Sequence, residues 1–253
     1  MMREVAGLPH LRVRALAEVG STNVLAMEAA RAGDPGGLWI LGGRQVEGRG
    51  RRARPWVSEP GNLYASYLVL DPASGDRLAQ LPLVAALALS EAVDEMCGTY
   101  ALAKLKWPND LLVDGAKISG ILLEATSLPN GSRAVVMGFG LNLVHHPDLA
   151  DYRAADLAGL GYQVDVGQAF AALAGSLERR LVSWNGEAGG DRLMADWQAR
   201  ATGLGKAIRV RFDSGETHGI FEGLDEIGRL RLRLEDGTLT SVSAGDVFFG
   251  NGS

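Results

Sequence analysis

Residues 42–56, GGRQVEGRGRRARPW, constrain most strongly how this chain can fold. Four glycines and five arginines in so short a stretch disfavour helix and strand alike, because glycine raises the entropy cost of ordering either. We therefore predict a loop, called here the arginine loop. Guanidinium groups on a pliable backbone suit the oxygens of phosphate and carboxylate groups. A solvated basic loop is the alternative, and this stretch alone does not decide between them.

The composition describes an ordinary globular protein with a local concentration of positive charge. The 253 residues are 47% hydrophobic and 22% charged, with a formal net charge of −5, which suits one large domain or two. Proteins dedicated to nucleic acid usually carry a basic domain, and too few residues precede Ser21 for a helix-turn-helix domain. The arginine loop therefore favours a small anionic ligand over DNA.

The same composition predicts a reducing, cytoplasmic location and no membrane partner. No apolar signal segment follows a basic start, and no uncharged run approaches ~18 residues. The longest candidate, 78–89, is too short to span a bilayer and is predicted as buried helix. The single cysteine, Cys97, cannot form an intramolecular disulfide and is expected in the core. The four histidines do not lie at metal-ligand spacing, which disfavours structural zinc.

Hydrophobic periodicity and turn residues predict alternating helices and strands up to residue 143. Ser21 or Thr22 is the expected N-cap of a first helix. A buried strand leads into the arginine loop, and Asp114-Gly115 predicts a tight hairpin turn farther along. The predicted strands are 11–16, 38–41, 62–70, 111–113, 118–123 and 135–143, and the predicted helices are 21–32 and 78–96.

Beyond residue 151 the chain first becomes helical and then rich in strands. Helices are predicted at 168–184 and 191–200, followed by a glycine-containing break at 202–205. Five short strands with glycine turns then predict a small barrel: 207–212, 217–224, 229–234, 238–243 and 247–249. We expect an α+β fold class with two domains, residues 1–203 with a mixed sheet and flanking helices, and residues 204–253.

Three segments distant in sequence combine polar side chains with glycine backbone: 48–51, 106–120 and 138–142. Polar groups in apolar surroundings need partners, either within the protein or on a ligand. Gly138 and Gly140 interrupt a strand where a ligand or a neighbouring backbone can come close. Neither a P-loop nor a dinucleotide-binding glycine motif occurs. An ATP site in this chain would therefore have another design.

Six blocks of sequence appear in an order typical of one enzyme family. They are Ser21-Thr22-Asn23; Gln45 with Gly48-Arg49-Gly50-Arg51-Arg52; Trp56; Lys106-Trp107-Pro108-Asn109-Asp110; Lys117-Ile118-Ser119-Gly120-Ile121-Leu122; and Gly138-Phe139-Gly140-Leu141-Asn142. Over about residues 15–250 the chain resembles the biotin–protein ligases, in the short class without a DNA-binding domain. This resemblance implies a catalytic domain similar to class II aminoacyl-tRNA synthetases, followed by an SH3-like barrel.

The resemblance also implies a reaction and a set of site residues. The family uses ATP to convert biotin to biotinoyl-5′-AMP, releasing pyrophosphate, and then transfers biotin to one lysine of a biotin carboxyl carrier domain. The implied biotin contacts are Ser21, Thr22, Asn23, Gln45, Gly48, Arg49, Lys117 and Gly120. The implied ATP and adenylate contacts are Arg49, Arg51, Trp56, Asn109, Lys117 and Asn142. The implied catalytic residues are Arg49, Arg51, Lys117 and Asp110. Arg52 and Arg54 are expected as outer-loop charges.

Asp110 has two further expected roles. It is the candidate protein ligand for Mg²⁺ and the candidate base for the carrier lysine, which must lose a proton before it can attack.

The arginine loop departs from the family pattern at one place. Many relatives read GRGRRGR, whereas this chain has Ala53 and then Pro55. Alanine disfavours positive φ and proline fixes φ, so we expect a stiffer loop.

Two alternatives of different kinds remain open at this stage. Lipoate–protein ligases and octanoyltransferases share the catalytic fold, but they carry a different lysine signature and lack the GRGRRxR block. A non-catalytic binder of a phospholigand or nucleic acid is opposed by the acidic net charge and the segment around Lys117. The expected partners are therefore ATP, biotin, Mg²⁺ and the carrier domain of a biotin-dependent carboxylase, without DNA. A homodimer paired through exposed strand edges is compatible with the sequence, which locates no interface.

Overall fold

The computed structural model describes residues 11–73, 75–148, 152–185, 189–212 and 214–249. Its helices are α1 (Thr22–Arg31), α2 (Leu81–Cys97), α3 (Val166–Asn185) and α4 (Gly189–Arg200), with short 3-10 helices at Arg51–Ala53 and Gly75–Gln80. Its strands are β1 (Arg12–Leu16), β2 (Leu38–Gly42), β3 (Leu63–Leu70), β4 (Lys104–Lys106), β5 (Asp110–Val113), β6 (Ala116–Ser127), β7 (Arg133–Leu141), β8 (Ala207–Phe212), β9 (Gly215–Leu224), β10 (Leu230–Arg233), β11 (Leu239–Val242) and β12 (Asp246–Phe249).

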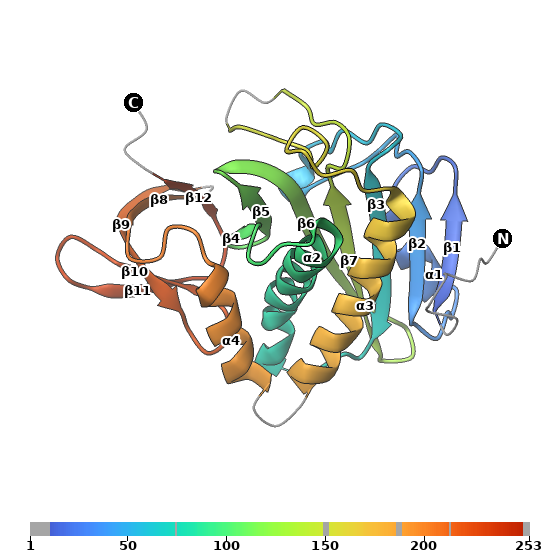
Figure 1. The fold of residues 1–253 in the computed structure, drawn as a ribbon. Coiled ribbons are helices and arrows are strands. Elements are labelled where there is room, and N and C mark those ends of the chain that lie inside the picture. The colour runs from blue at the N-terminus through green and yellow to red at the C-terminus, as the bar shows by residue number, and fades with distance from the viewer. Residues whose placement is uncertain (1–10, 74, 149–151, 186–188, 213, 250–253) are drawn as a thin grey trace.

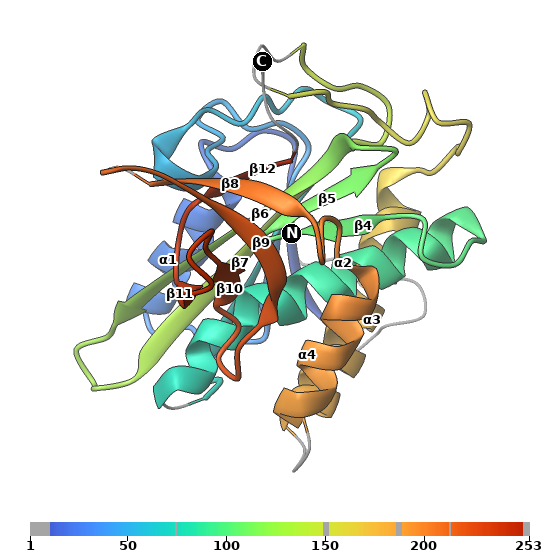
Figure 2. The same ribbon diagram turned by 90° about the vertical axis from the view of Figure 1, so that its left-hand side faces the viewer.

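The strands form two sheets that lie next to each other. The larger sheet has seven strands in the order β1-β2-β3-β7-β6-β5-β4, and the smaller has five in the order β11-β10-β9-β8-β12. Figure 1 shows the small sheet beside the β4–β5 edge of the large one, and Figure 2 views the same arrangement from the small sheet. The mixed sheet with flanking helices confirms the predicted α+β class.

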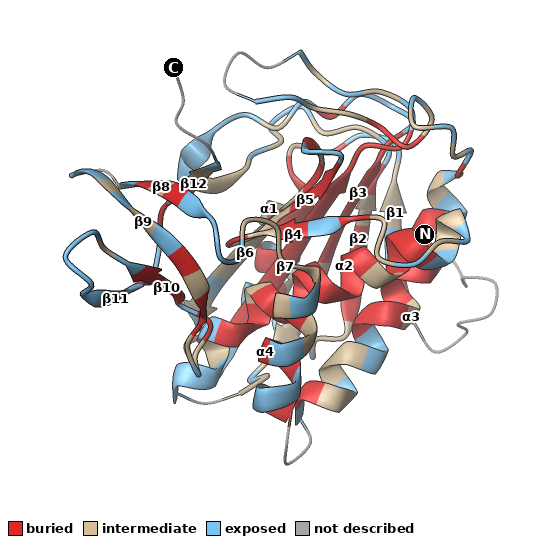
Figure 3. Cartoon of the chain, turned by 60° about the vertical axis from the view of Figure 1, so that its left-hand side comes forward, coloured by how far each residue is buried: buried red, intermediate tan, exposed pale blue. Residues whose placement is uncertain are grey.

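The large sheet is covered by helices on both faces. Successive side chains of a strand point to opposite faces, so β2 contributes to two cores. Leu38 and Ile40 pack against α1. Trp39 points the other way, with ring centroids 6.0 Å from Phe139 of β7 and 5.2 Å from Phe170 of α3. The buried residues coloured in Figure 3 accordingly gather along the sheet and on the inner sides of the helices.

Helix α2 is buried around most of its circumference, as its apolar sequence predicts, with 12 of its 17 residues buried. Its start differs from the predicted residue 78, because Gly75–Gln80 form a 3-10 helix and the α-helix begins at Leu81. Pro82 accounts for the later start, since proline lacks an N–H and suits a first helical turn. Cys97 is half-buried at the edge of the core rather than inside it, and burial raises the pKa of its thiol to about 11.

The other three α-helices begin and end within two residues of the predicted positions. Ser21 lies at the N-cap of α1, but its side chain makes no capping hydrogen bond. None of the helices in the described ranges is long and apolar enough to cross a membrane.

The predicted hairpin at Asp114-Gly115 is confirmed. Both residues have positive φ, 50° and 76°, as a tight hairpin turn requires. The turn joins β5 to β6, so Asp110 at the start of β5 lies one strand away from Lys117 on β6. Two residues of opposite charge are thereby brought together by local chain reversal alone.

The five C-terminal strands also form where predicted, as one antiparallel sheet. Its inward side chains, such as Val210 and Phe221, belong to the same buried cluster as α2. Trp107 Nε1 donates a hydrogen bond to the Gly228 carbonyl oxygen at 3.1 Å, and the Gln80 amide donates one to the Glu226 carbonyl at 2.7 Å. The small sheet is thus bound to the helical face and to the turn that follows β4.

A buried ion pair between Asp94 of α2 and Arg200 of α4 provides a test of this packing. Arg200 Nη1 lies 2.7 Å from Asp94 Oδ2, and the two side chains are only 12% and 9% exposed. We predict that Asp94→Ala lowers the free energy of unfolding by about 3–5 kcal/mol, because it leaves Arg200 buried and unpaired. Urea unfolding followed by circular dichroism measures this loss.

The neighbouring residue supplies a matched control. Glu95 pairs with Arg179 at the surface, where both side chains are more than half exposed. Glu95→Ala should therefore cost less than about 1 kcal/mol. Equal losses in the two variants would contradict the assigned importance of the buried pair.

Candidate functional site

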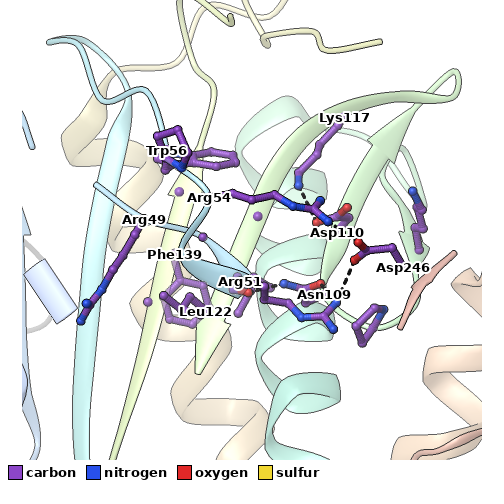
Figure 4. Close-up of a pocket in the computed structure, with 18 of the residues that line it drawn as sticks. Arg49, Arg51, Arg54, Trp56, Asn109, Asp110, Lys117, Leu122, Phe139 and Asp246 are labelled. Atoms are coloured by element: carbon purple, nitrogen blue, oxygen red, sulfur yellow. Dashed lines mark hydrogen bonds and ion pairs between the residues drawn. The ribbon is translucent and has the colours of Figure 1, made fainter. Parts of the chain in front are cut away.

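A pocket lies where the arginine loop, the large sheet and the small sheet meet (Figure 4). Its lining comes from the first turn of α1, the arginine loop, the turn between β4 and β5, the strands β6 and β7, and the start of β12. The three polar segments singled out in the sequence therefore do converge. The small sheet adds a fourth segment that no sequence motif indicated.

The floor of the pocket consists of two glycines that face each other on adjacent strands. Gly120 of β6 is paired in register with Gly140 of β7, and the Trp56 indole lies over both. A Cβ added to Gly140 would be 2.5 Å from Trp56 Nε1, and one on Gly120 would be 3.0 Å from the ring. The indole N–H is buried without a hydrogen-bond partner. The close approach expected at Gly140 is thus made by an aromatic side chain of the loop itself.

Hydrogen bonds join the start of α1 to the arginine loop. The Thr22 backbone N–H donates to Gln45 Oε1 at 2.9 Å, and the Thr22 hydroxyl donates to the same oxygen at 3.0 Å. The first N–H groups of a helix lack partners within the helix, so Gln45 fulfils the capping role that the sequence assigned to Ser21 or Thr22. The Gln45 amide in turn donates to Ser58 Oγ at 3.0 Å. Gln45 is therefore held from both sides.

Asn23 links the same helix to β6 and β3 and packs against β7. Its amide donates to Glu124 Oε2 at 2.8 Å, and its Oδ1 lies 2.6 Å from the buried Ser66 hydroxyl. A Cβ on Gly138 would fall 2.1 Å from that Oδ1, so a glycine is needed there. The other Glu124 oxygen accepts a hydrogen bond from Arg49 at 3.2 Å. Figure 4 shows Arg49 directed away from Lys117 and Arg51.

A second group of charges lies on the opposite side of the floor. Lys117 Nζ is 2.7 Å from Asp110 Oδ1, and both side chains are mostly buried. The same Nζ lies 5.4 Å from the centroid of the Trp56 ring, a cation–π distance. Arg51 donates to Asn109 Oδ1 at 3.4 Å, and burial lowers the pKa of its guanidinium despite the nearby carboxylates. Burial likewise lowers the pKa of Lys106, whose Nζ lies 5.6 Å from the Phe248 ring.

The arginine loop folds back on itself instead of extending into solvent. The backbone N–H of Trp56 donates to the Gly48 carbonyl, and the backbone N–H of Gly50 donates to the Arg54 carbonyl, each at 2.8 Å. Between these bonds Arg52 and Ala53 have φ of 54° and 56°. Left-handed backbone costs roughly 1–2 kcal/mol per non-glycine residue. Ala53 therefore has a positive φ, which is unfavourable for alanine and which the glycine at this position in many relatives adopts more easily.

Most of the residues implied by the resemblance line this pocket: Ser21, Thr22, Asn23, Gln45, Arg49, Arg51, Trp56, Asn109, Asp110, Lys117 and Gly120. Gly48 and Asn142 do not line it. A Cβ on Gly48 would lie 2.5 Å from the Trp56 carbonyl oxygen, so Gly48 serves the fold of the loop. Asn142 is buried and donates to the Ala155 carbonyl at 3.0 Å. Arg54 also lies at the pocket, with a side chain that is 58% exposed, as expected for an outer-loop charge.

Sequence reasoning missed several residues that organise the site, among them Ser58, Ser66, Glu124, Asp246 and Phe248. Ser66 is recognisable in the sequence, because it is a polar residue in the middle of the apolar strand β3. Glu124 and Asp246 are not recognisable in this way, since their partners are 75 or more residues away along the chain.

Two family models match the chain. The model for the biotin/lipoate A/B protein ligase family matches residues 20–142, and the model for the biotin protein ligase C-terminal domain matches residues 203–250. The biotin–[acetyl-CoA-carboxylase] ligase of Paracoccus denitrificans is 39% identical over 241 residues, which cover 93% of this chain and 99% of that protein. The protein of the same name from Mycobacterium tuberculosis is 33% identical, covering 96% of this chain and 90% of that protein.

A solved structure agrees with these sequence matches. The biotin protein ligase from Aquifex aeolicus, in complex with biotin and ATP, has a TM-score of 0.79 and 27% identity, and the match covers 93% of this chain and 97% of that one. The predicted fold class and the resemblance noted in the sequence are both confirmed. With identity extending over nearly the whole length of these relatives, the chain belongs to the biotin–protein ligase family.

Proposed function

We propose that the pocket joins biotin to ATP and then passes biotin to a lysine of a carrier protein. The observation that carries this proposal is the convergence of Lys117, Arg51 and Asp110 beside the glycine floor. Gly120 and Gly140 have no side chains that could obstruct a ligand there. The names of the relatives, with acetyl-CoA carboxylase as the protein modified, support a biotin carboxyl carrier domain as the partner. The comparisons do not favour the lipoate alternative.

The side of the pocket near α1 suits the biotin ring. A ureido group offers both donors and acceptors, and Ser21, Thr22 and Gln45 present both kinds of atom there. Because Gln45 is held by Thr22 and Ser58, its amide keeps one orientation. The apolar side chain of Leu122 lines the pocket beside the floor and suits the valerate chain.

The first step requires an oxygen of the biotin carboxylate to attack the α-phosphorus of ATP, with pyrophosphate leaving. Two anions must approach, so cations aimed at the reacting phosphate lower the barrier. We assign this role to Arg51 and Lys117, and to Arg49 after it leaves Glu124. Trp56 must then leave the glycine floor, and we propose that it covers the adenine. Asn142 remains a proposed contact on the adenine side; in the ligand-free protein it is buried and donates to the Ala155 carbonyl.

Mg²⁺ fits the residues present. The carboxylates that line the pocket are Asp110 and Asp246, and of these Asp110 faces the Lys117 side. Mg²⁺ is commonly bound by one or two carboxylates together with substrate phosphates, so Asp110, with Asn109 beside it, is the proposed protein contact. When bound, the ion would neutralise charge on the triphosphate.

The second step forms an amide bond between the carrier lysine and the biotin carbonyl carbon, with AMP leaving. A lysine with a pKa of ~10.4 is neutral in roughly one part in a few thousand at pH 7. A base at the pocket therefore helps, and we propose Asp110, which can receive the proton once Lys117 has turned to the phosphate.

We also propose a division into two domains near residue 203. It is supported by the end of α4 at Arg200, the start of β8 at Ala207 and the separate ranges of the two family models.

Pyrophosphate release tests the proposed function. With ATP, Mg²⁺ and biotin the protein should release pyrophosphate, and with lipoate in place of biotin it should not. Turnover with lipoate and none with biotin would contradict the proposal. Lys117→Gln should lower the biotin-dependent rate at least ~100-fold, because it removes a cation from the reacting phosphate. Lys104→Gln is the matched control, since Lys104 is an exposed lysine on β4 and should keep the parental rate.

The base assignment is tested by supplying biotinoyl-5′-AMP directly to an Asp110→Asn variant. Transfer to a carrier domain should fall about 100-fold or more. The residual rate should rise about tenfold per pH unit below pH 9, because the lysine must then lose its proton to solvent. Rapid-quench measurement of biotinylated carrier across this pH range gives both values. Parental transfer combined with slow adenylate formation would exclude Asp110 as the base.

A further inference from the structure

Asp246, the first residue of β12, joins the small sheet to the arginine loop. Its side chain is 16% exposed and faces three arginines of the loop, of which Figure 4 labels Arg51 and Arg54. Arg52 Nη1 lies 3.2 Å from Asp246 Oδ2, Arg54 donates to the same oxygen, and Arg51 Nη1 is 3.8 Å from Oδ1. Arg51 also donates to the carbonyl oxygen of Gly245 at 3.3 Å. Gly245 and Asp246 together therefore bind three arginines that are close together in the sequence.

The loop needs such a counter-charge. Arg51 is largely buried, and the charges of Arg52 and Arg54 add to burial in lowering the pKa of its guanidinium. Three guanidinium groups this close repel one another, and Arg52 and Ala53 have the unfavourable left-handed backbone described above. Burial of Asp246 opposes its ionisation, yet the hydrogen bond from Arg54 and the three positive charges lower its pKa below the usual value. Asp246 is thus ionised where the loop requires an anion.

We propose that Asp246 is a positioning residue that holds the arginine loop closed over the pocket, so that the small sheet determines how long the adenylate is retained. The loop closure follows from contacts of the ligand-free protein. The effect on adenylate retention rests on the proposed function. Asp246 affects the reaction indirectly, by positioning Arg51, whose guanidinium also contacts Asn109 at the pocket.

The alternative is that Asp246 occupies the place of a phosphate and competes with it. The two possibilities predict opposite signs for the same variant. If Asp246 holds the loop closed, Asp246→Asn releases the adenylate faster. If Asp246 competes with phosphate, the same variant retains the adenylate longer.

The first experiment is limited trypsin digestion of the ligand-free protein, scored by cleavage after Arg49, Arg51 or Arg52. Asp246→Asn should be cleaved at least about tenfold faster than the parent, because neutralising the carboxylate weakens the ion pairs that hold the loop. Asp246→Glu should restore most of the protection. Glu235→Gln, which alters an exposed acid in the turn between β10 and β11, should behave as the parent. Circular dichroism establishes that each variant is folded.

The second experiment measures release of biotinoyl-5′-AMP from preloaded enzyme, using biotinylation of bystander lysines on serum albumin. Asp246→Asn should release the adenylate about tenfold faster, and Arg54→Gln, which alters an exposed side chain and leaves Asp246 intact, should act in the same direction. Parental cleavage and parental release in both variants would overturn the proposal, as would slower release. If the parent forms no adenylate, the proposed function fails while faster cleavage of Asp246→Asn still supports the closed loop.

Discussion

The site depends on gathering cations that would separate without counter-charges. In the ligand-free protein several cations of the pocket meet an acid supplied by another part of the fold. Arg49 meets Glu124 of β6, Lys117 meets Asp110 of β5, and the outer arginines meet the small sheet. These partners hold the positive charges at the pocket in partly buried positions, where an arriving phosphate interacts with them more strongly than in water. The contacts of Arg49 with Glu124 and of Lys117 with Asp110 must open when the phosphate binds, whereas those with the small sheet remain.

The large sheet provides the rigid part of this arrangement. Gly120 and Gly140 face each other because β6 and β7 pair in register, and their missing side chains leave the surface on which Trp56 now lies. Helix α1 fixes one side of the pocket through Gln45. The first part of the arginine loop is bound by backbone hydrogen bonds, such as that from the Val46 N–H to the Val19 carbonyl at 2.9 Å. The arginines that follow contact the rest of the fold through their side chains. A fixed floor beneath a separable loop suits an enzyme that must admit two substrates and then shield a reactive anhydride from water.

Local sequence signals predicted the elements of this fold better than the contacts between them. Periodicity located the helices, and the φ requirement of a tight turn located the hairpin at Asp114-Gly115. The late start of α2 agrees with Pro82, which suits a first helical turn, although apolar periodicity alone extends the helix back to residue 78. Motif resemblance brought together most of the pocket, whereas Gly48 and Asn142, two of the contacts that it implies, lie outside the lining and have internal partners in the ligand-free protein. Asp246 could not be predicted, because pairing between distant segments depends on the folded arrangement of two sheets.

The most direct test of this account is a crystal structure with a non-hydrolysable analogue of biotinoyl-5′-AMP. Arg51 and Lys117 should contact the phosphate within hydrogen-bonding distance, with the Lys117–Asp110 pair opened and Trp56 lifted from Gly120 and Gly140. The ring of biotin should lie beside Thr22 and Gln45. A phosphate bound away from these cations, with Lys117 still paired to Asp110 and Trp56 still on the glycine floor, would contradict the central claim.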